Sequence, residues 1–224
     1  MNESLNGAVT IGKPAPTFAL EVINRNGQVS LDDYRGRSGL FLNVVRGLHC
    51  PFCRRHLTQL ANTEVNLKQS GVETLVVVST SPERAGKYLR YRPSPLTIAS
   101  DPDTTVHRTY GLPKFAVTEE PDDWPRAISA ATLATPLPDP TGELSELTPI
   151  HETVRKLNEK DGYETEPGEV EIDISPAGIM LEGRFMIDRD SIVRWIHVEA
   201  REGPQNFAET PSPREVLEAA SLLN

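Results

Sequence analysis

Short apolar runs and segments with helical periodicity alternate along residues 18–112. Runs rich in apolar residues predict three strands, at 40–45, 73–79 and 96–100. Between and after them, apolar positions at helical spacing, or an N-cap residue followed by proline, predict three helices, at 51–70, 82–91 and 102–110. This alternation is typical of an α/β protein with at least partly parallel strands and right-handed crossovers.

Two antiparallel hairpins flank this alternation. Their short strands are predicted at 18–22, 28–31, 184–187 and 192–198. The first hairpin is expected at an edge of the sheet, with its turn at Asn26-Gly27. A last helix opens at Ser212-Pro213, where serine caps and proline takes the first helical position, and it ends near Leu223. We predict one domain over residues 1–224.

Residues 113–178 differ in composition from the rest and are interpreted as an insertion before the final hairpin. They hold 9 of the 19 prolines, with 15 acidic against 5 basic residues and a local charge of −10. Helices are predicted at 126–134 and 147–160, and loops at 135–142 and 161–171. We expect a solvated cover or a contact in a homodimer, with substrate gating as the alternative.

The charge balance argues against a nucleic-acid partner. The 224 residues include 32 acidic and 23 basic ones, and the net charge of −9 would repel a polyanion. Outside the insertion the acids number 17 and the bases 18, so the acidity belongs to the insertion. No apolar run reaches about 18 residues, and the first ten residues lack the basic and apolar regions of a secretory signal. We therefore expect a cytoplasmic protein with no membrane partner.

The two cysteines, Cys50 and Cys53, stand three residues apart, a spacing that suits redox chemistry better than structural cross-linking. Cys50 falls at the N-cap of the helix predicted from Pro51, where unpaired N–H groups and the helix dipole favour a thiolate. Nearby cations act in the same sense, and those expected to stabilise the thiolate are Arg46, His49 and Arg54. A lowered pKa of the Cys50 thiol is predicted, and the thiolate is the attacking species.

Cys53 can reach Cys50 without a large movement of the backbone. A mixed disulfide or a sulfenic acid on Cys50 could therefore resolve to a Cys50–Cys53 bridge. Two other interpretations stay open: buried structural thiols, and a zinc site completed by His49 or His56, although a second ligand pair is lacking. Haem attachment is excluded because Arg54, not histidine, follows Cys53. No cofactor or metal is expected.

Further segments carry a resemblance to a known family, and they lie at 12–20, 27–31, 34–36 and 185–194. Together with the cysteine segment, they resemble the peroxiredoxin-like family (alkyl hydroperoxide reductase and thiol-specific antioxidant type) of the thioredoxin superfamily. The resemblance covers roughly residues 12–112 and 183–223 and no part of the insertion. It implies a thioredoxin-like fold, a central mixed β-sheet with helices on both faces, with Cys50 as nucleophile and Cys53 as resolving thiol.

The sequence departs from the family's peroxidase pattern before the first cysteine. Typical peroxiredoxins carry threonine or serine three residues before that cysteine and proline seven before, where this chain has Gly47 and Asn43. Residues 180–183 also lack the proline that thioredoxin-like reductases place before the strand facing their cysteines. Arg184 is either a surface charge or, as the resemblance implies, a substitute for the family's arginine near the same strand, helping to stabilise the thiolate.

These observations predict a thiol–disulfide oxidoreductase that cycles through an intramolecular disulfide. Its expected partners are a thiol reductant of the thioredoxin or glutathione type and a disulfide or hydroperoxide substrate. Disulfide exchange is favoured over peroxide reduction, because the peroxide-activating hydroxyl is missing at Gly47. The alternative from another class is a non-catalytic redox sensor whose acidic insertion binds a partner.

Overall fold

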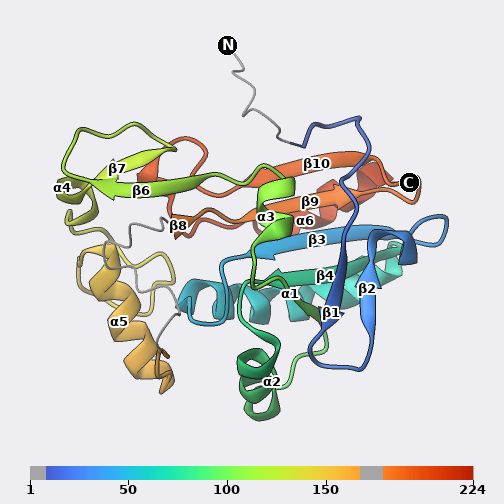
Figure 1. Ribbon diagram of the computed structural model, residues 1–224, viewed down its shortest axis with the longest axis horizontal. Helices are drawn as coiled ribbons and strands as arrows, with labels where there is room; N and C mark the ends of the chain where they lie inside the picture. The colour runs from blue at the N-terminus through green and yellow to red at the C-terminus, as the bar shows by residue number, and fades with distance from the viewer. Residues whose placement is uncertain (1–8, 167–178, 224) are drawn as a thin grey trace.

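The computed structural model describes residues 9–166 and 179–223, and a mixed seven-stranded sheet runs through its centre (Figure 1). In spatial order the strands are β10 (Val193–Val198), β9 (Gly183–Ile187), β3 (Gly39–Val45), β4 (Val72–Val78), β5 (Thr97–Ser100), β1 (Ala19–Val22) and β2 (Gln28–Ser30). The pairs β3–β4 and β4–β5 are parallel, whereas β9 pairs antiparallel with β3 and β1 pairs antiparallel with β5. Both hairpins are confirmed, and the first forms an edge of the sheet.

Helices cover both faces of this sheet. Buried residues of α1 (Pro51–Gln69), α2 (Pro82–Tyr91) and α6 (Pro213–Ala220) join one core cluster, whereas those of α3 (Thr105–Thr109) join the other. Successive side chains of β3 alternate between them, Phe41 in the first cluster and Leu42 in the second. Every residue of β3 is buried, which explains the continuous apolar run. The α/β fold class is confirmed.

Two predicted helices are shorter than their sequence signals suggested. The helix predicted at 102–110 begins only at Thr105, because the Asp101 carboxylate accepts hydrogen bonds from the N–H groups of Thr105 and Val106 rather than from earlier ones. The last helix, α6, gives way to a 3₁₀ turn at Ser221–Leu223. Other 3₁₀ turns lie at Leu31–Asp33 and Pro204–Asn206.

The insertion builds a second, three-stranded sheet that sequence reasoning missed. Its strands, in spatial order, are β7 (Ala127–Ser129), β6 (Lys114–Thr118) and β8 (Ile179–Met180). The helix predicted at 126–134 is therefore wrong in its first half, where Ile128 is buried in a strand, and only α4 (Ala130–Leu133) is helical. The helix predicted at 147–160 is α5 (Ile150–Asp161), which starts after Pro149. The loop predicted at 161–171 lies partly outside the described residues.

Glycines in β9 and α2 offer a test of the packing. A Cβ at Gly183 would overlap Leu112 Cδ2 and lie 3.0 Å from ring atoms of Phe185, at the start of a strand whose residues are all buried. We expect Gly183→Ala to lower the free energy of unfolding by about 1–3 kcal/mol. Gly86→Ala, in the interior of α2 with its nearest neighbour at 3.9 Å, should be neutral or stabilising by about 0.5–1 kcal/mol. Urea unfolding of both variants checks this, and equal effects would contradict it.

Candidate active site

The loop that carries the cysteines connects the buried end of β3 to the start of α1. Cys50 is the N-cap residue of α1 and Pro51 its first residue, as predicted. The Cys50 sulfur accepts a hydrogen bond from the backbone N–H of Cys53 at 3.3 Å. Both thiols are free and buried, with 2% and 0% of their residue surfaces exposed. The start of the helix therefore presents its donor group to the sulfur of Cys50.

The two thiols have opposite acidities. Burial raises the pKa of Cys50, but a hydrogen bond from the Cys53 side chain and the positive charge of Arg46 outweigh it and lower the pKa to about 7. Burial, the hydrogen bond to Cys50 and the negative charges of Cys50 and Glu182 raise the pKa of Cys53 well above its usual range. At neutral pH, about half of Cys50 is therefore ionised, whereas Cys53 is protonated. The direction for Cys50 agrees with the sequence-based expectation.

Glu182, which sequence reasoning missed, lies directly against Cys53. Its Oε1 accepts a hydrogen bond from Cys53 Sγ at 2.8 Å. Arg46 Nη2 lies 3.1 Å from Oε1, and Arg184 Nη2 lies 2.7 Å from Oε2. Burial opposes the charge of the carboxylate, but the two arginines lower its pKa to about 2. The available signal was a carboxylate and a guanidinium two residues apart in the otherwise apolar stretch 179–187.

Arg184 is fully buried on β9, so its interpretation as a surface charge is wrong. Its Nε donates a hydrogen bond to His56 Nε2 at 3.0 Å, while its Nη2 pairs with Glu182. Burial and the charge of Arg184 lower the pKa of His56 well below its usual range, so the ring is neutral. Arg184 therefore acts on the cysteines through Glu182.

Arg46 is held by a second carboxylate that the sequence analysis did not single out. Its Nη1 lies 2.5 Å and its Nη2 3.0 Å from the two oxygens of buried Glu199, just after β10. Glu199 Oε2 also accepts the backbone N–H of Glu182 at 3.0 Å. Arg46 is thus fixed between Glu199 and Glu182, with its charge beside Cys50.

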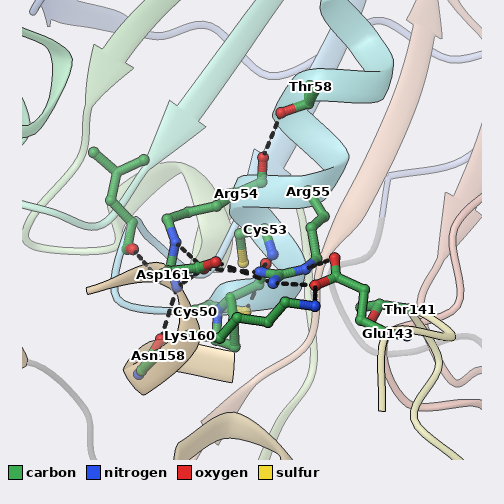
Figure 2. Close-up of polar contacts among 12 residues, drawn as sticks. Cys50, Cys53, Arg54, Arg55, Thr58, Thr141, Glu143, Asn158, Lys160 and Asp161 are labelled. Carbon is green, nitrogen blue, oxygen red and sulfur yellow. Dashed lines mark hydrogen bonds and ion pairs between the residues drawn. The ribbon is translucent and has the colours of Figure 1, made fainter. Parts of the chain in front are cut away.

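The insertion packs over the start of α1 through its acidic residues (Figure 2). Arg54 Nη2 lies 2.5 Å and Arg55 Nη1 lies 2.9 Å from Asp161 Oδ2, at the end of α5. Arg55 Nε also lies 2.5 Å from Glu143 Oε1. We call the two acidic residues Glu143 and Asp161, together with their partners Arg54 and Arg55, the acidic clamp. Ile150 of α5 belongs to the same apolar cluster as Cys50, so the insertion helps to bury the cysteine site.

Arg54, which is predicted to stabilise the thiolate, forms its ion pair with the insertion, and the role predicted for His49 stays a prediction. The Arg54 guanidinium turns away from the sulfur toward Asp161, and it also lies over the Tyr163 ring at 4.5 Å. The His49 carbonyl accepts a hydrogen bond from Arg54 Nη1 at 3.3 Å. The main charged groups that act on the Cys50 thiol are Arg46 and Glu182. Arg54 therefore attaches the insertion to α1 instead of stabilising the thiolate directly.

An apolar cavity of about 430 Å³ lies between the insertion and the segment after β10. Its lining includes Phe115, Trp124, Ile128, Leu133, Leu137, Ile150 and Phe207. Phe207 also stacks on the Arg46 guanidinium at 4.5 Å and packs edge-on against Phe52 of α1. The cavity is therefore separated from the charge beside Cys50 by one aromatic side chain.

Three donor atoms of the site could approach a metal ion. The sulfurs of Cys50 and Cys53 and one oxygen of Glu182 lie within 4.8 Å of one another. Both Glu182 oxygens already pair with buried guanidinium groups, whose positive charges oppose a cation there. His56, considered above as a further ligand, accepts a hydrogen bond from an arginine through Nε2. The arrangement suits proton and charge control of two thiols better than zinc binding.

A central mixed sheet covered by helices, with two buried cysteines at the start of a helix, defines a mixed α/β protein whose candidate site is a pair of thiols. The AhpC/TSA family model matches residues 11–196, which include the insertion. The chain therefore belongs to the AhpC/TSA family, and the resemblance stated from the sequence is confirmed.

Individual relatives agree with this assignment. A protein of Haemophilus influenzae assigned as the peroxiredoxin bcp is 27% identical over 105 residues, which cover 46% of this chain and 66% of the relative. Among solved structures, the reduced 2-Cys peroxiredoxin of Plasmodium vivax is similar with a TM-score of 0.56 at 17% identity, covering 94% of this chain and 80% of that one.

Two further structures have the same fold. A yeast mitochondrial 1-Cys peroxiredoxin has a TM-score of 0.56 at 13% identity. The match covers 95% of this chain and 75% of the peroxiredoxin chain. A protein of Chlorobium tepidum assigned as the thiol:disulfide interchange protein DsbE has a TM-score of 0.52 at 19% identity, covering 97% and 100%. The predicted thioredoxin-like fold is confirmed.

The acidity of Cys50 is open to direct measurement. We expect its alkylation by iodoacetamide to be half-maximal near pH 7 in the reduced protein. Cys53→Ala should raise this midpoint by about one pH unit, because the thiolate loses a hydrogen-bond donor. Cys53→Ser retains a donor and should change the midpoint less. If the midpoint in Cys53→Ala stayed at that of the unmodified protein, the Cys53 side chain would not stabilise the thiolate.

The acidic clamp is expected to limit access to Cys50. Asp161→Asn removes the charge shared by Arg54 and Arg55, so opening of α5 should become easier. We expect Cys50 alkylation at pH 9, where the thiol is ionised, to be at least about threefold faster. Glu146→Gln, which breaks an exposed pair with Lys156 in the same insertion, is the control. Unchanged rates in both variants would exclude the clamp as a barrier.

Proposed function

We propose that this protein is a thiol–disulfide oxidoreductase in which Cys50 attacks the substrate and Cys53 resolves the adduct. The proposal rests on one observation. The Cys50 sulfur receives the N–H of Cys53 at the helix start, whereas the Cys53 thiol donates its own hydrogen bond to a carboxylate. The Cys50 sulfur is therefore favoured as a thiolate and the Cys53 sulfur as a thiol. A two-step exchange needs one sulfur that attacks first and one that reacts second.

The reaction follows from this division. The Cys50 thiolate attacks one sulfur of the substrate disulfide, forms a mixed disulfide and releases the first substrate thiolate. Cys53 then attacks the Cys50 sulfur, and the second substrate sulfur leaves with the Cys53 proton. The substrate gains two electrons and the protein holds a Cys50–Cys53 disulfide, with both sulfurs one helical turn apart. A thiol reductant restores the two thiols.

Peroxide reduction is the second candidate, favoured by membership of the AhpC/TSA family. The Cys50 thiolate would attack the terminal peroxide oxygen, forming a sulfenic acid and releasing an alcohol or water. Cys53 would then condense with the sulfenic acid and release water. Gly47 offers no hydroxyl on the loop before Cys50, at the position where typical members of the family carry threonine or serine. Disulfide exchange therefore ranks first.

Substrate access requires a movement, because only 2% of Cys50 is exposed. The insertion is one of the segments that contact the cysteine helix, and the acidic clamp attaches it to the start of that helix. We therefore favour substrate gating for the insertion. This assigns the excess negative charge of residues 113–178 partly to contacts with α1.

The expected partners are a thioredoxin- or glutathione-type reductant and a disulfide or hydroperoxide substrate. The yeast peroxiredoxin with the same fold is described as resolved by glutathione and thioredoxin systems, which supports this choice. A homodimer and a cytoplasmic location stay predictions. None of the helices that the structure describes is long and apolar enough to cross a membrane.

Turnover by cysteine variants tests the proposal. Cys50→Ser should lose reduction of a small aromatic disulfide completely, because the attacking sulfur is gone. Cys53→Ser should still react once and accumulate a mixed disulfide on Cys50, visible as a mass increase in intact-protein mass spectrometry.

Hydroperoxide consumption measured in parallel decides the ranking. Rapid consumption that depends on Cys50, with slow disulfide reduction, would favour the peroxidase. If Cys53→Ser retained full turnover without a trapped adduct, the resolving role of Cys53 would be wrong.

A further inference from the structure

The carboxylate of Glu182 competes with Cys50 for a single proton. Cys53 carries one S–H group, and two negatively charged acceptors lie beside it: Glu182 Oε1 at 2.8 Å and the Cys50 sulfur. All three groups are buried, so water cannot supply a substitute donor without a movement of the protein. The position of this proton therefore decides which sulfur is the nucleophile.

The Glu182 carboxylate is fixed in place and kept charged. Arg46 holds Oε1 and Arg184 holds Oε2, while the backbone N–H of Glu182 is bound to Glu199. Rotation of the carboxylate away from Cys53 would break contacts to two buried guanidinium groups, which is costly in a low-dielectric interior. Glu182 is thus a rigid acceptor aimed at the Cys53 sulfur.

Negative charge at this position acts on both sulfurs, but only one of them touches it. The charge of Glu182 disfavours ionisation of both thiols, but at Cys50 the charge of Arg46 outweighs that of Glu182, whereas at Cys53 the charge of Glu182 outweighs that of Arg46. The Cys50 sulfur accepts a hydrogen bond from the backbone N–H of Cys53 at 3.3 Å, whereas no backbone N–H of the described residues donates to the Cys53 sulfur. The same carboxylate therefore penalises the two thiolates to different extents.

We infer that Glu182 assigns the roles of the two cysteines by keeping the proton on Cys53, so that Cys50 alone is the attacking sulfur. The inference rests on the proposed two-thiol function. Once Cys50 has entered a mixed disulfide, its negative charge is gone and one of the two anions beside Cys53 has disappeared. Cys53 then attacks, the Cys50–Cys53 bond forms, and the Cys53 proton leaves on the departing substrate thiol.

The charged and titratable groups that face Glu182 come from several elements. Among the described residues they are Cys50, Cys53 and His56 of the α1 segment, Arg46 after β3, Arg184 of β9 and Glu199 after β10. The pKa of His56 is lowered well below its usual range, so its ring is neutral and adds no charge beside the thiols near neutral pH. Alkylation against pH therefore reports on the thiols.

The test is the pH profile of alkylation of each cysteine, read by mass spectrometry on the full-length reduced protein. In Glu182→Gln, the Cys50 midpoint should fall by about one pH unit, because the Cys53 proton is left to Cys50. In a Cys50→Ser background, the Cys53 midpoint should also fall by about one pH unit when Glu182→Gln is added.

Glu199→Gln is the matched control, because it removes an equal charge from Arg46 without touching either sulfur. It should leave the Cys53 midpoint unchanged in the Cys50→Ser background. Equal shifts of the Cys53 midpoint in Glu182→Gln and Glu199→Gln, or no shift in either, would overturn the inference.

Glu182→Asp keeps the charge and provides a second measurement if Glu182→Gln does not fold, as judged by circular dichroism. Its shorter side chain draws the carboxylate back from Cys53, so the Cys53 midpoint should fall while the Cys50 midpoint changes less than in the glutamine variant. An unchanged Cys53 midpoint would contradict the inference. These readouts need no turnover, so a protein without reductase activity but with these midpoints would refute the proposed function and not the role of Glu182.

Discussion

One buried guanidinium, that of Arg46 at the end of β3, must be paired with negative charge, and the rest of the site is arranged around this pairing. Arg46 leaves β3 beneath the cysteine loop, where an unpaired charge would cost several kcal/mol. Glu199 and Glu182, both from the C-terminal part of the chain, supply the opposing charges. This pairing joins the two halves of the sheet at the point where α1 begins. It also places a fixed positive charge beside Cys50 and a fixed negative charge beside Cys53.

The difference between the two thiols follows from this arrangement together with the start of α1. A helix N-terminus stabilises any anion at its N-cap, so the position of Cys50 before Pro51 already favours a thiolate. The thiol one turn later receives no such help and meets Glu182 instead. Two identical side chains therefore acquire opposite proton affinities within one turn of helix. Two-step thiol exchange requires this asymmetry.

The insertion adds a layer of structure beside the start of the cysteine helix. Its acidic residues pair with Arg54 and Arg55 near the start of the cysteine helix. Its apolar residues enclose a cavity that reaches Phe207, the aromatic ring stacked on Arg46. The same segment therefore shields the thiols and forms an apolar space beside them. Both effects bear on which molecules reach Cys50.

Local signals in the sequence were enough for the alternation of strands and helices, the edge hairpin and the capping position of Cys50, because each depends on neighbours within a few residues. The second sheet was missed, since β6, β7 and β8 are too short to show periodicity and are separated by many residues. Arg54 was expected to act on the Cys50 sulfur, but its guanidinium forms an ion pair with Asp161, which is 107 positions away in the sequence. Glu182 approaches Cys53 across 129 positions. Charge pairing over such separations is decided by folding, so only the tertiary structure revealed which groups control the two thiols.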